Sequence, residues 1–222
     1  MHVHDGDLWG EMLRWVLDGN LTHVDFWVNL SPSVFHLEKS IRDSLPSSHV
    51  VISENRGRDI GGLLWLLAEV VDLQYDFIGF LHTKSSSIAR EELFSPLFGS
   101  PVAVRNCIDV FSTRSDVGML GSGRGHLHPA LSAGATFLDG AVVDLATSLQ
   151  LQQQIGMPFA PGTVFWARAS ALLPFFRTHS PKQLWSQLRM EAESSSYELP
   201  HAWERVFSYI IHAAGFSLLL MQ

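Results

Sequence analysis

The sequence predicts an α/β fold: a mostly parallel, Rossmann-like sheet flanked by helices, built as a single domain over residues 1–222. Short apolar runs alternate along the chain with longer stretches in which apolar residues recur every three or four positions. Strands that alternate with helices are joined by crossover connections, so neighbouring strands are parallel. These crossovers are right-handed. At 222 residues, 46% of them apolar, the chain is long enough to bury a substantial core.

The first half alternates four expected strands with three expected helices. The opening His2-Val3-His4-Asp5 resembles the end of a first strand whose beginning is missing, so we expect a domain excised from a longer protein. After it we expect helices at 8–17, 34–45 and 63–72 and strands at 24–30, 49–52 and 75–81.

The second half is more mixed. The loop from Gly121 to Gly140 is rich in glycine, lacks an apolar period and is expected to act as a lid. Around it we expect strands at 117–120, 163–167 and 216–221 and helices at 101–111, 141–154, 169–176, 181–193 and 200–214.

The charge balance excludes several classes of partner. The net charge is −7, so the chain lacks the basic face that nucleic acids require. Cys107 is the single cysteine, which fits a reducing compartment. No apolar run reaches the roughly 18 residues of a membrane span, and no signal peptide is recognisable. We therefore expect a cytoplasmic protein, at most peripheral at the inner membrane face, with no nucleic-acid partner and no transmembrane segment.

The turn at 53–62 separates an apolar strand from an apolar helix, and ligands of open α/β sheets bind at such strand ends. Gly57 can adopt a left-handed φ, while Arg56 and Arg58 place two permanent cations beside the unsatisfied N–H groups of the helix. The turn therefore predicts a site for a small anion. The alternative is a solvated turn in which Asp59 only caps the helix.

Further polar residues follow the other expected strands. The fourth strand runs into His82-Thr83-Lys84, which places a histidine and a lysine at the same sheet edge as the two arginines. The ends of the first two strands add His4, Asp5, Asn29 and Ser31.

Two histidine pairs favour an alternative, a metal-dependent hydrolase. His2 and His4 are two apart on a strand and point to one face, and His126 and His128 repeat this spacing in a loop. The chain is too short, however, for the barrel of about 250 residues on which such chemistry is common. Each histidine alone is more readily explained as a polar residue at a strand end or in a loop.

Six motifs run along nearly the whole chain: ENRGRDIG at 54–61, YDFIGFLHTKSS at 75–86, PLFGS at 96–100, VGML at 117–120, FAPGTVFWARASAL at 159–172 and LPHAWERVF at 199–207. In order and spacing they resemble the rhamnan synthesis protein F family of bacterial glycosyltransferases. More distantly, the arrangement is similar to the GT-A fold of nucleotide-sugar transferases.

The resemblance implies an enzyme that moves a sugar from a nucleotide diphosphate donor to a polysaccharide or lipid-linked glycan acceptor. Rhamnose or another deoxysugar is implied by the family name alone. Residues 1–100 would bind the nucleotide-sugar and residues 101–222 the acceptor. A glycan-binding domain that kept the fold but lost the chemistry is a further alternative.

The resemblance also exposes a departure. A GT-A enzyme usually carries Asp-x-Asp for a divalent metal where this chain has His82-Thr83-Lys84, so we expect no metal cofactor. A lysine can replace the metal's charge, since an ion pair at 4 Å contributes about 4 kcal/mol at an effective dielectric constant of 20.

Roles for individual residues follow from the same resemblance. Glu198, ahead of the last helix, is the expected base that deprotonates the acceptor, and Asp59 would hold donor hydroxyls. Glu204 is expected to form a structural pair with Arg205 or Arg168. The expected donor-binding residues are His4, Asp5, Asn29, Ser31, Asn55, Arg56, Gly57, Arg58, His82, Thr83, Lys84 and His201.

Overall fold

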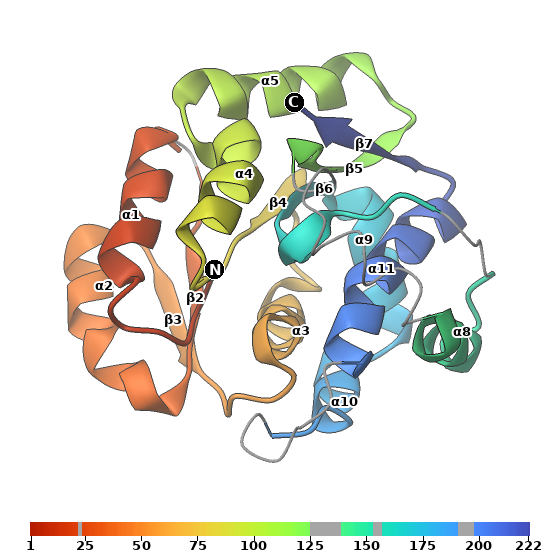
Figure 1. The fold of residues 1–222 in the computed structure, drawn as a ribbon, viewed down its shortest axis with the longest axis horizontal. Helices are drawn as coiled ribbons and strands as arrows, with labels where there is room; N and C mark the ends of the chain where they lie inside the picture. Colours follow the sequence, from red (N-terminus) through yellow and green to blue (C-terminus); the bar gives the residue numbers. More distant parts are fainter. Residues whose placement is uncertain (22–23, 125–138, 153–156, 191–197) are drawn as a thin grey trace.

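A computed structural model describes residues 1–21, 24–124, 139–152, 157–190 and 198–222. It shows a mixed α/β fold in which helices pack on both faces of the β-structure (Figure 1). The α/β class predicted from the sequence is therefore confirmed.

The strands form two sheets that meet at their edges. One sheet is parallel throughout, in the order β1-β2-β3, and the other has the order β4-β6-β5-β7. A parallel bridge between His2 and His82 joins them, because His2 N–H donates to Leu81 O at 3.1 Å and Thr83 N–H donates to His2 O at 3.0 Å. The strands are β1 (His2–Val3), β2 (Trp27–Leu30), β3 (His49–Ile52), β4 (Phe77–Phe80), β5 (Val117–Ser122), β6 (Phe165–Arg168) and β7 (Ser217–Met221).

The second sheet is mixed, which corrects the expectation of a parallel Rossmann-like sheet. β6 runs antiparallel to both of its neighbours, β4 and β5, whereas β5 and β7 are parallel. The cause lies in the 3₁₀ turn Pro161–Thr163, which precedes β6 and lies beside His82 at the carboxyl end of β4. A strand that starts at this edge must run back across the sheet.

Each expected helix has a counterpart in the structure, although several begin or end at other residues. Among the described residues, no helix is both long and apolar enough to cross a membrane. They are α1 (Trp9–Asp18), α2 (Glu38–Ser44), α3 (Arg58–Val70), α4 (Ser87–Phe98), α5 (Pro101–Thr113), α8 (Asp139–Ser148), α9 (Ala169–Thr178), α10 (Pro181–Ser186) and α11 (Glu198–Ala213), with a 3₁₀ helix at Pro32–Leu37.

Two helices depart from the sequence prediction for identifiable reasons. α3 begins at Arg58 rather than at residue 63, so Gly61 and Gly62 lie inside the helix and not in the turn. α4 was not expected, because it buries residues around much of its circumference, including Arg90 and Pro96, and so shows no single apolar face.

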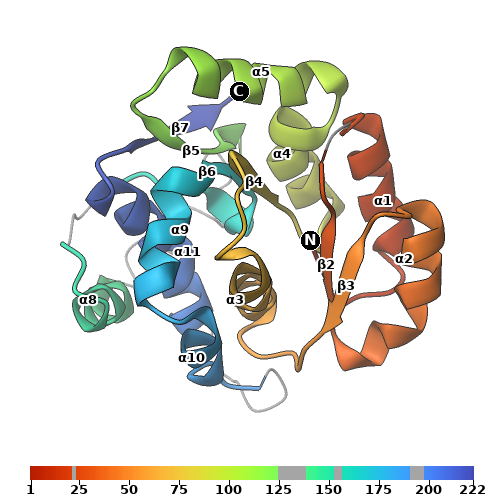
Figure 2. The ribbon, with the colours of Figure 1, turned by 180° about the vertical axis from the view of Figure 1, so that it is seen from behind.

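Two hydrophobic cores lie on opposite faces of the β-structure. Neighbouring strand residues alternate between them, so that Phe80 packs in one core and Leu81 in the other. One core gathers side chains of α3, α9 and α11, which lie close together in the view from behind (Figure 2). The other gathers side chains of α1, α4 and α5. The strands are thus covered on both faces, and their carboxyl ends are left to carry polar residues.

Candidate functional site

A row of buried polar side chains ties together the carboxyl ends of β1, β2 and β3. His2 Nδ1 lies 2.7 Å from Asn29 Oδ1, and Asn29 Nδ2 donates to Ser53 Oγ at 2.9 Å. All three residues are buried. Because buried polar groups must hydrogen-bond to one another, this row fixes the strand ends. Both the oxygen and the nitrogen of the Asn29 side-chain amide are hydrogen-bonded within the protein.

A second contact joins the ends of β1 and β4. The His4 backbone N–H donates to Thr83 Oγ1 at 3.1 Å, and His4 Nδ1 lies 2.8 Å from the same oxygen. The rings of His4 and His2 stack with their centroids 5.6 Å apart. Thr83 is buried, while His4 remains partly exposed at the edge of the sheet. Thr83 therefore positions His4, which is the member of the pair that a ligand can reach.

Two other predicted donor residues lie at the same strand ends. Ser31 is buried after β2, and its Oγ has no hydrogen-bond partner among the residues that the structure describes. Asp5 is partly exposed, and its Oδ1 accepts the backbone N–H of Asp7 at 3.1 Å. Both side chains lie at the predicted edge of the sheet.

The turn before α3 has the left-handed backbone expected of its glycine. Gly57 has φ 58° and ψ 23°, and Arg58 follows with φ 60°. Gly57 N–H donates to Arg189 O at 3.0 Å, which ties the turn to the segment after α10. The left-handed φ of Arg58 is uncommon for a non-glycine residue, and such strained positions are found most often at functional sites.

Glycines bring the start of α3 unusually close to its surroundings. A Cβ on Gly61 would lie 1.7 Å from Arg56 O, and a Cβ on Gly62 would lie 2.2 Å from Cγ of His2. Neither position tolerates a side chain without movement of the helix. The helix N-terminus is thus held against β1 and its histidine.

The predicted cation Arg56 is engaged in holding α10. It pairs with Glu54 at 2.8 Å, donates to Leu188 O at 3.3 Å and lies over the Trp185 ring at 5.0 Å from its centroid. These contacts explain the position of the turn. Of the two predicted arginines, Arg58 is the one whose charge acts on His201.

His82 and Asp59 meet beside the turn that precedes β6. His82 Nε2 lies 2.8 Å from Gly162 O and 3.6 Å from Asp59 Oδ2, while Nδ1 lies 2.9 Å from Thr83 O. A neutral imidazole carries one N–H, so only one of the two carbonyl oxygens accepts a hydrogen bond from His82. The hydroxyl of Thr163, in the turn that precedes β6, helps to lower the pKa of Asp59.

Glu204 of α11 reaches this turn from the opposite side. Its Oε1 accepts the backbone N–H of Gly162, which has φ 68°, and its Oε2 lies 3.4 Å from Nη1 of Arg205. The Lys84 Nζ lies 3.3 Å from the point that a Cβ on Gly162 would occupy. An amine and a carboxylate thus flank one glycine. The pairing of Glu204 with Arg205 agrees with expectation, whereas Arg168 instead donates to the carbonyl of Val117 at 2.7 Å.

The titration of these groups is shifted by burial and by their mutual charges. Burial raises the pKa of Glu204 to about 7, although Arg205 favours its charged form. Burial also acts to raise the pKa of Asp59, but the charges of His82 and Lys84 outweigh it and the pKa falls below its usual value. Near neutral pH the site therefore contains one ionised carboxylate and one that readily exchanges a proton.

The two buried histidines of this edge are held in the neutral form. Burial lowers the pKa of His2 to about 3, and the charge of His4 lowers it further. Burial also lowers the pKa of His82, against the opposing charge of Asp59. Neutral imidazoles leave Lys84 as the cation on this side of the site.

An ion pair between a buried arginine and a partly exposed glutamate positions the loop that carries Lys84. Arg90 of α4 forms a two-bond pair with Glu11 of α1, at 2.8 Å and 2.7 Å. The same guanidinium donates to the carbonyl oxygens of Lys84 and Ser85. Because guanidinium donors lie in a fixed plane, the pair holds both carbonyls and orients the loop.

α11 supplies two further candidates at its N-terminal end. Burial, together with Arg205, lowers the pKa of His201, and Asp59, Arg58 and Lys84 also act on this histidine. Glu198 is the first residue of α11, but its side chain lies outside the described residues. Its backbone position is one turn before His201.

Two predictions fall outside the part of the chain that the structure describes. These are the His126 and His128 pair and most of the expected lid at 121–140. Within the described residues, no group of three or more His, Cys, Asp or Glu side chains is arranged to hold a metal ion.

Three residues of the site were not assigned a functional role by the sequence. The sequence assigns Glu204 a structural pairing and gives Thr163 and Arg90 no role. The FAPGTVFWAR motif contained the signal for Thr163, since a Pro-Gly turn ahead of a buried strand places its backbone beside other strand ends. No comparable local signal marks Arg90, whose partner lies 79 residues away.

The fold and this edge define an α/β protein with a lysine, neutral histidines and two carboxylates gathered where parallel strands end. The chain belongs to the rhamnan synthesis protein F family, whose sequence model matches residues 1–216. The name of the family refers to the synthesis of rhamnan, a polysaccharide.

Two curated relatives from Xanthomonas campestris pv. campestris, both called uncharacterized protein WxcX, are similar to this chain. One is from strain B100 and the other from strain ATCC 33913, and each is 28% identical over 225 residues. The match covers 97% of this chain but 31% of each relative, so the chain spans about a third of their length. No solved structure matches the chain.

Proposed function

We propose that this chain is a GT-A-like glycosyltransferase domain that moves a sugar from a nucleotide diphosphate donor to a bacterial surface polysaccharide. The sugar is rhamnose or another deoxysugar, as the name of the family suggests. Residues 1–100 would hold the donor and residues 101–222 the acceptor. The acceptor is a polysaccharide or a lipid-linked glycan.

One observation carries this proposal: the amine of Lys84 beside Gly162, at the sheet edge where β4 ends. Its charge acts on both Asp59 and Glu204, so the three groups share one site. A cation at this position can stabilise the two negative charges of a departing diphosphate, which is the role a divalent metal has in many transferases. Arg58 at the start of α3 is the second proposed cation.

The reaction would proceed in a single displacement. The oxygen of an acceptor hydroxyl bonds to the anomeric carbon of the donor sugar, and the bond from that carbon to the diphosphate oxygen breaks. The electron pair of the broken bond leaves with the nucleoside diphosphate, beside Lys84. The hydroxyl proton passes to a carboxylate, and the configuration at the anomeric carbon inverts.

The proposed base is Glu198, and its position on α11 supports this role. Residues three apart on a helix lie on neighbouring surfaces, so Glu198, His201 and Glu204 follow one side of α11. Glu204 is the second candidate, because its pKa of about 7 suits proton transfer near neutral pH. Both of its oxygens are engaged, however, by Gly162 N–H and by Arg205.

The test is a transfer assay with radiolabelled nucleotide-sugars and the cell's own glycan as acceptor, run with and without EDTA. We expect transfer that survives EDTA. Glu198→Gln should lower turnover at least about a hundredfold while the donor still binds, since a general base contributes about 10²–10⁴-fold. Glu204→Gln is the matched comparison on the same helix.

Each alternative predicts a different result in this assay. A hydrolase would release free sugar only when metal is present. A glycan-binding domain would bind the acceptor and leave every donor intact. Retention of the donor's anomeric configuration would remove the need for a base on α11.

A further inference from the structure

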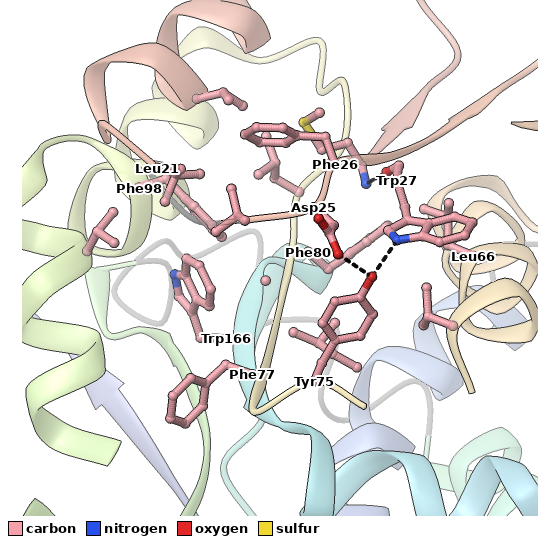
Figure 3. Close-up of a pocket in the computed structure, with 18 of the residues that line it drawn as sticks. Leu21, Asp25, Phe26, Trp27, Leu66, Tyr75, Phe77, Phe80, Phe98 and Trp166 are labelled. Atoms are coloured by element: carbon pink, nitrogen blue, oxygen red, sulfur yellow. Dashed lines mark hydrogen bonds between the residues drawn. The ribbon is translucent and has the colours of Figure 1, made fainter. Parts of the chain in front are cut away.

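An apolar slot lies between β2 and β4, at the end of the sheet opposite the candidate site (Figure 3). Its volume is about 450 Å³. Two continuous stretches of backbone, 24–27 and 75–81, line its sides, and Met1 lies at one end. Leu66 and its neighbours on α3 form one wall, and Trp166 and Phe98 form the opposite one. The slot thus has a sheet edge on each side and an apolar layer on each face.

β1 is in line with this slot, because it lies between the same two strands, β2 and β4, and Met1 before it lines the slot. β1 pairs with β2 on one side and, through His2, with the end of β4 on the other. Asn29 N–H donates to Met1 O at 2.9 Å, and the Met1 amine donates to Trp27 O at 2.6 Å. Both neighbouring strands continue beyond Met1: Trp27 pairs with His49 of β3, and Phe77 pairs with Arg168 of β6. The backbones of β2 and β4 therefore continue along the two sides of the slot.

The Met1 amine occupies a position that suits an amide better than an ammonium. Met1 is buried, and burial lowers the pKa of its amine to about 5. An amide N–H would make the same bond to Trp27 O without a charge to desolvate.

We propose that the slot is the acceptor site for a β-strand segment joined to the Met1 nitrogen by a peptide bond. Such a segment is extended, apolar and about four residues long, at about 3.3 Å per residue. It runs parallel to β2 and β4, completes β1 and turns the two sheets into one. This proposal is independent of the sugar-transfer proposal.

The register of this segment follows from the bonds that β1 already makes. Parallel ladders repeat every two residues. The backbone N–H of the added residue directly before Met1 therefore donates to Gly79 O, and its carbonyl accepts from Leu81 N–H. The N–H of the added residue one position earlier donates to Asp25 O, and its carbonyl accepts from Trp27 N–H. Alternate side chains face Leu66 and Trp166, so both faces of the segment are apolar.

A polar rim marks the far end of the slot. Trp27 Nε1 donates to the Tyr75 hydroxyl at 3.0 Å, and this hydroxyl donates to Asp25 Oδ2 at 2.9 Å (Figure 3). The segment would pass this rim as it enters. A covalently joined strand is favoured over a free peptide, because the carboxylate of a free peptide would have to be buried beside the Met1 amine.

The test compares three chains: residues 1–222, the same chain with Thr-Ile-Val-Ile-Val joined to Met1, and a control with Thr-Ile-Val-Ile-Pro in its place. Proline removes the N–H that donates to Gly79 O. The readouts are the thermal midpoint and the exchange rates of the Leu81 and Trp27 amide protons.

We expect the first extension to raise the midpoint and to slow exchange of both amides by at least about tenfold relative to the other two chains. Equal exchange in all three chains would overturn the proposal, because it would mean that the added segment stays outside the slot. Equal protection by both extensions would also overturn it, since the bond to Gly79 would then not be made.

Discussion

The carboxylate of Glu204 accepts a hydrogen bond from the backbone N–H of Gly162, a residue 42 positions earlier in the chain. This bond joins α11 to the turn whose carbonyl oxygen at Gly162 also contacts His82 Nε2. The Lys84 amine lies beside the same glycine. The left-handed φ of Gly162, 68°, aims its N–H at Glu204 and its carbonyl at His82. One glycine thus connects the two halves of the chain at the site.

The pH dependence of stability should reveal the raised pKa of Glu204. Its pKa is about 7 in the folded protein and 4.5 for an unperturbed glutamate, so the folded state binds more protons between these values. Its contribution therefore falls as pH rises from about 4.5 to about 7, by up to about 3 kcal/mol. Glu204→Gln removes this loss, and urea unfolding at several pH values measures it.

The comparison must use the difference between the variant and the unchanged chain. The lowered pKa of His2, about 3, has the opposite effect, because its neutral form adds stability that is lost as pH falls below about 6.5. This contribution cancels in the difference. A difference that stays constant between pH 4.5 and 7 would contradict the raised pKa of Glu204.

Gly62→Ala should destabilise the protein by about 1–3 kcal/mol, because the new Cβ would meet the His2 ring at 2.2 Å and push α3 from β1. Gly10→Ala is the matched control inside α1, where nothing lies within 4 Å of the added Cβ. That change should stabilise by about 0.5–1 kcal/mol. Thermal unfolding of both variants measures the effects, and equal shifts would show that His2 does not pack as described.

Arg90→Lys should lower both stability and donor affinity. Lysine cannot make the two-bond pair with Glu11 while it holds the carbonyls of Lys84 and Ser85. Removing one partner of a fully buried pair costs about 3–5 kcal/mol, and this conservative change in a pair whose Glu11 is partly exposed should cost less than that. Arg114→Lys, in the exposed pair with Asp116, is the control and should cost less than about 1 kcal/mol. Unchanged donor affinity in Arg90→Lys would show that the Arg90–Glu11 pair does not position the donor site.

Local patterns in the sequence were sufficient for much of the fold. The β3 strand was predicted with its observed bounds, and the polar ends of β1, β2 and β4 do meet at one edge. The start of α3 was placed late, because glycines at 61 and 62 indicate a turn in sequence, whereas in the protein they allow close packing inside a helix.

The remaining features depend on contacts between distant residues. The direction of β6 depends on where the Pro161–Thr163 turn lies, and no periodicity in β6 itself encodes that. Arg56 contacts Leu188, which lies 132 residues later in the chain, and the ring of the nearby Trp185. The shifted pKa of Glu204 comes from burial, which only the packed structure reveals.

The most direct test of the proposed donor site is calorimetric titration of a nucleoside diphosphate in EDTA against the unchanged chain, Lys84→Ala and Lys39→Ala. Lys39 is an exposed control that pairs with Asp43 on α2. The account predicts that Lys84→Ala weakens diphosphate binding at least about tenfold, a loss of about 1.4 kcal/mol, while Lys39→Ala does not change it. Equal affinity in Lys84→Ala and Lys39→Ala, or binding that vanishes for all three proteins in EDTA, would contradict a lysine-based, metal-independent site.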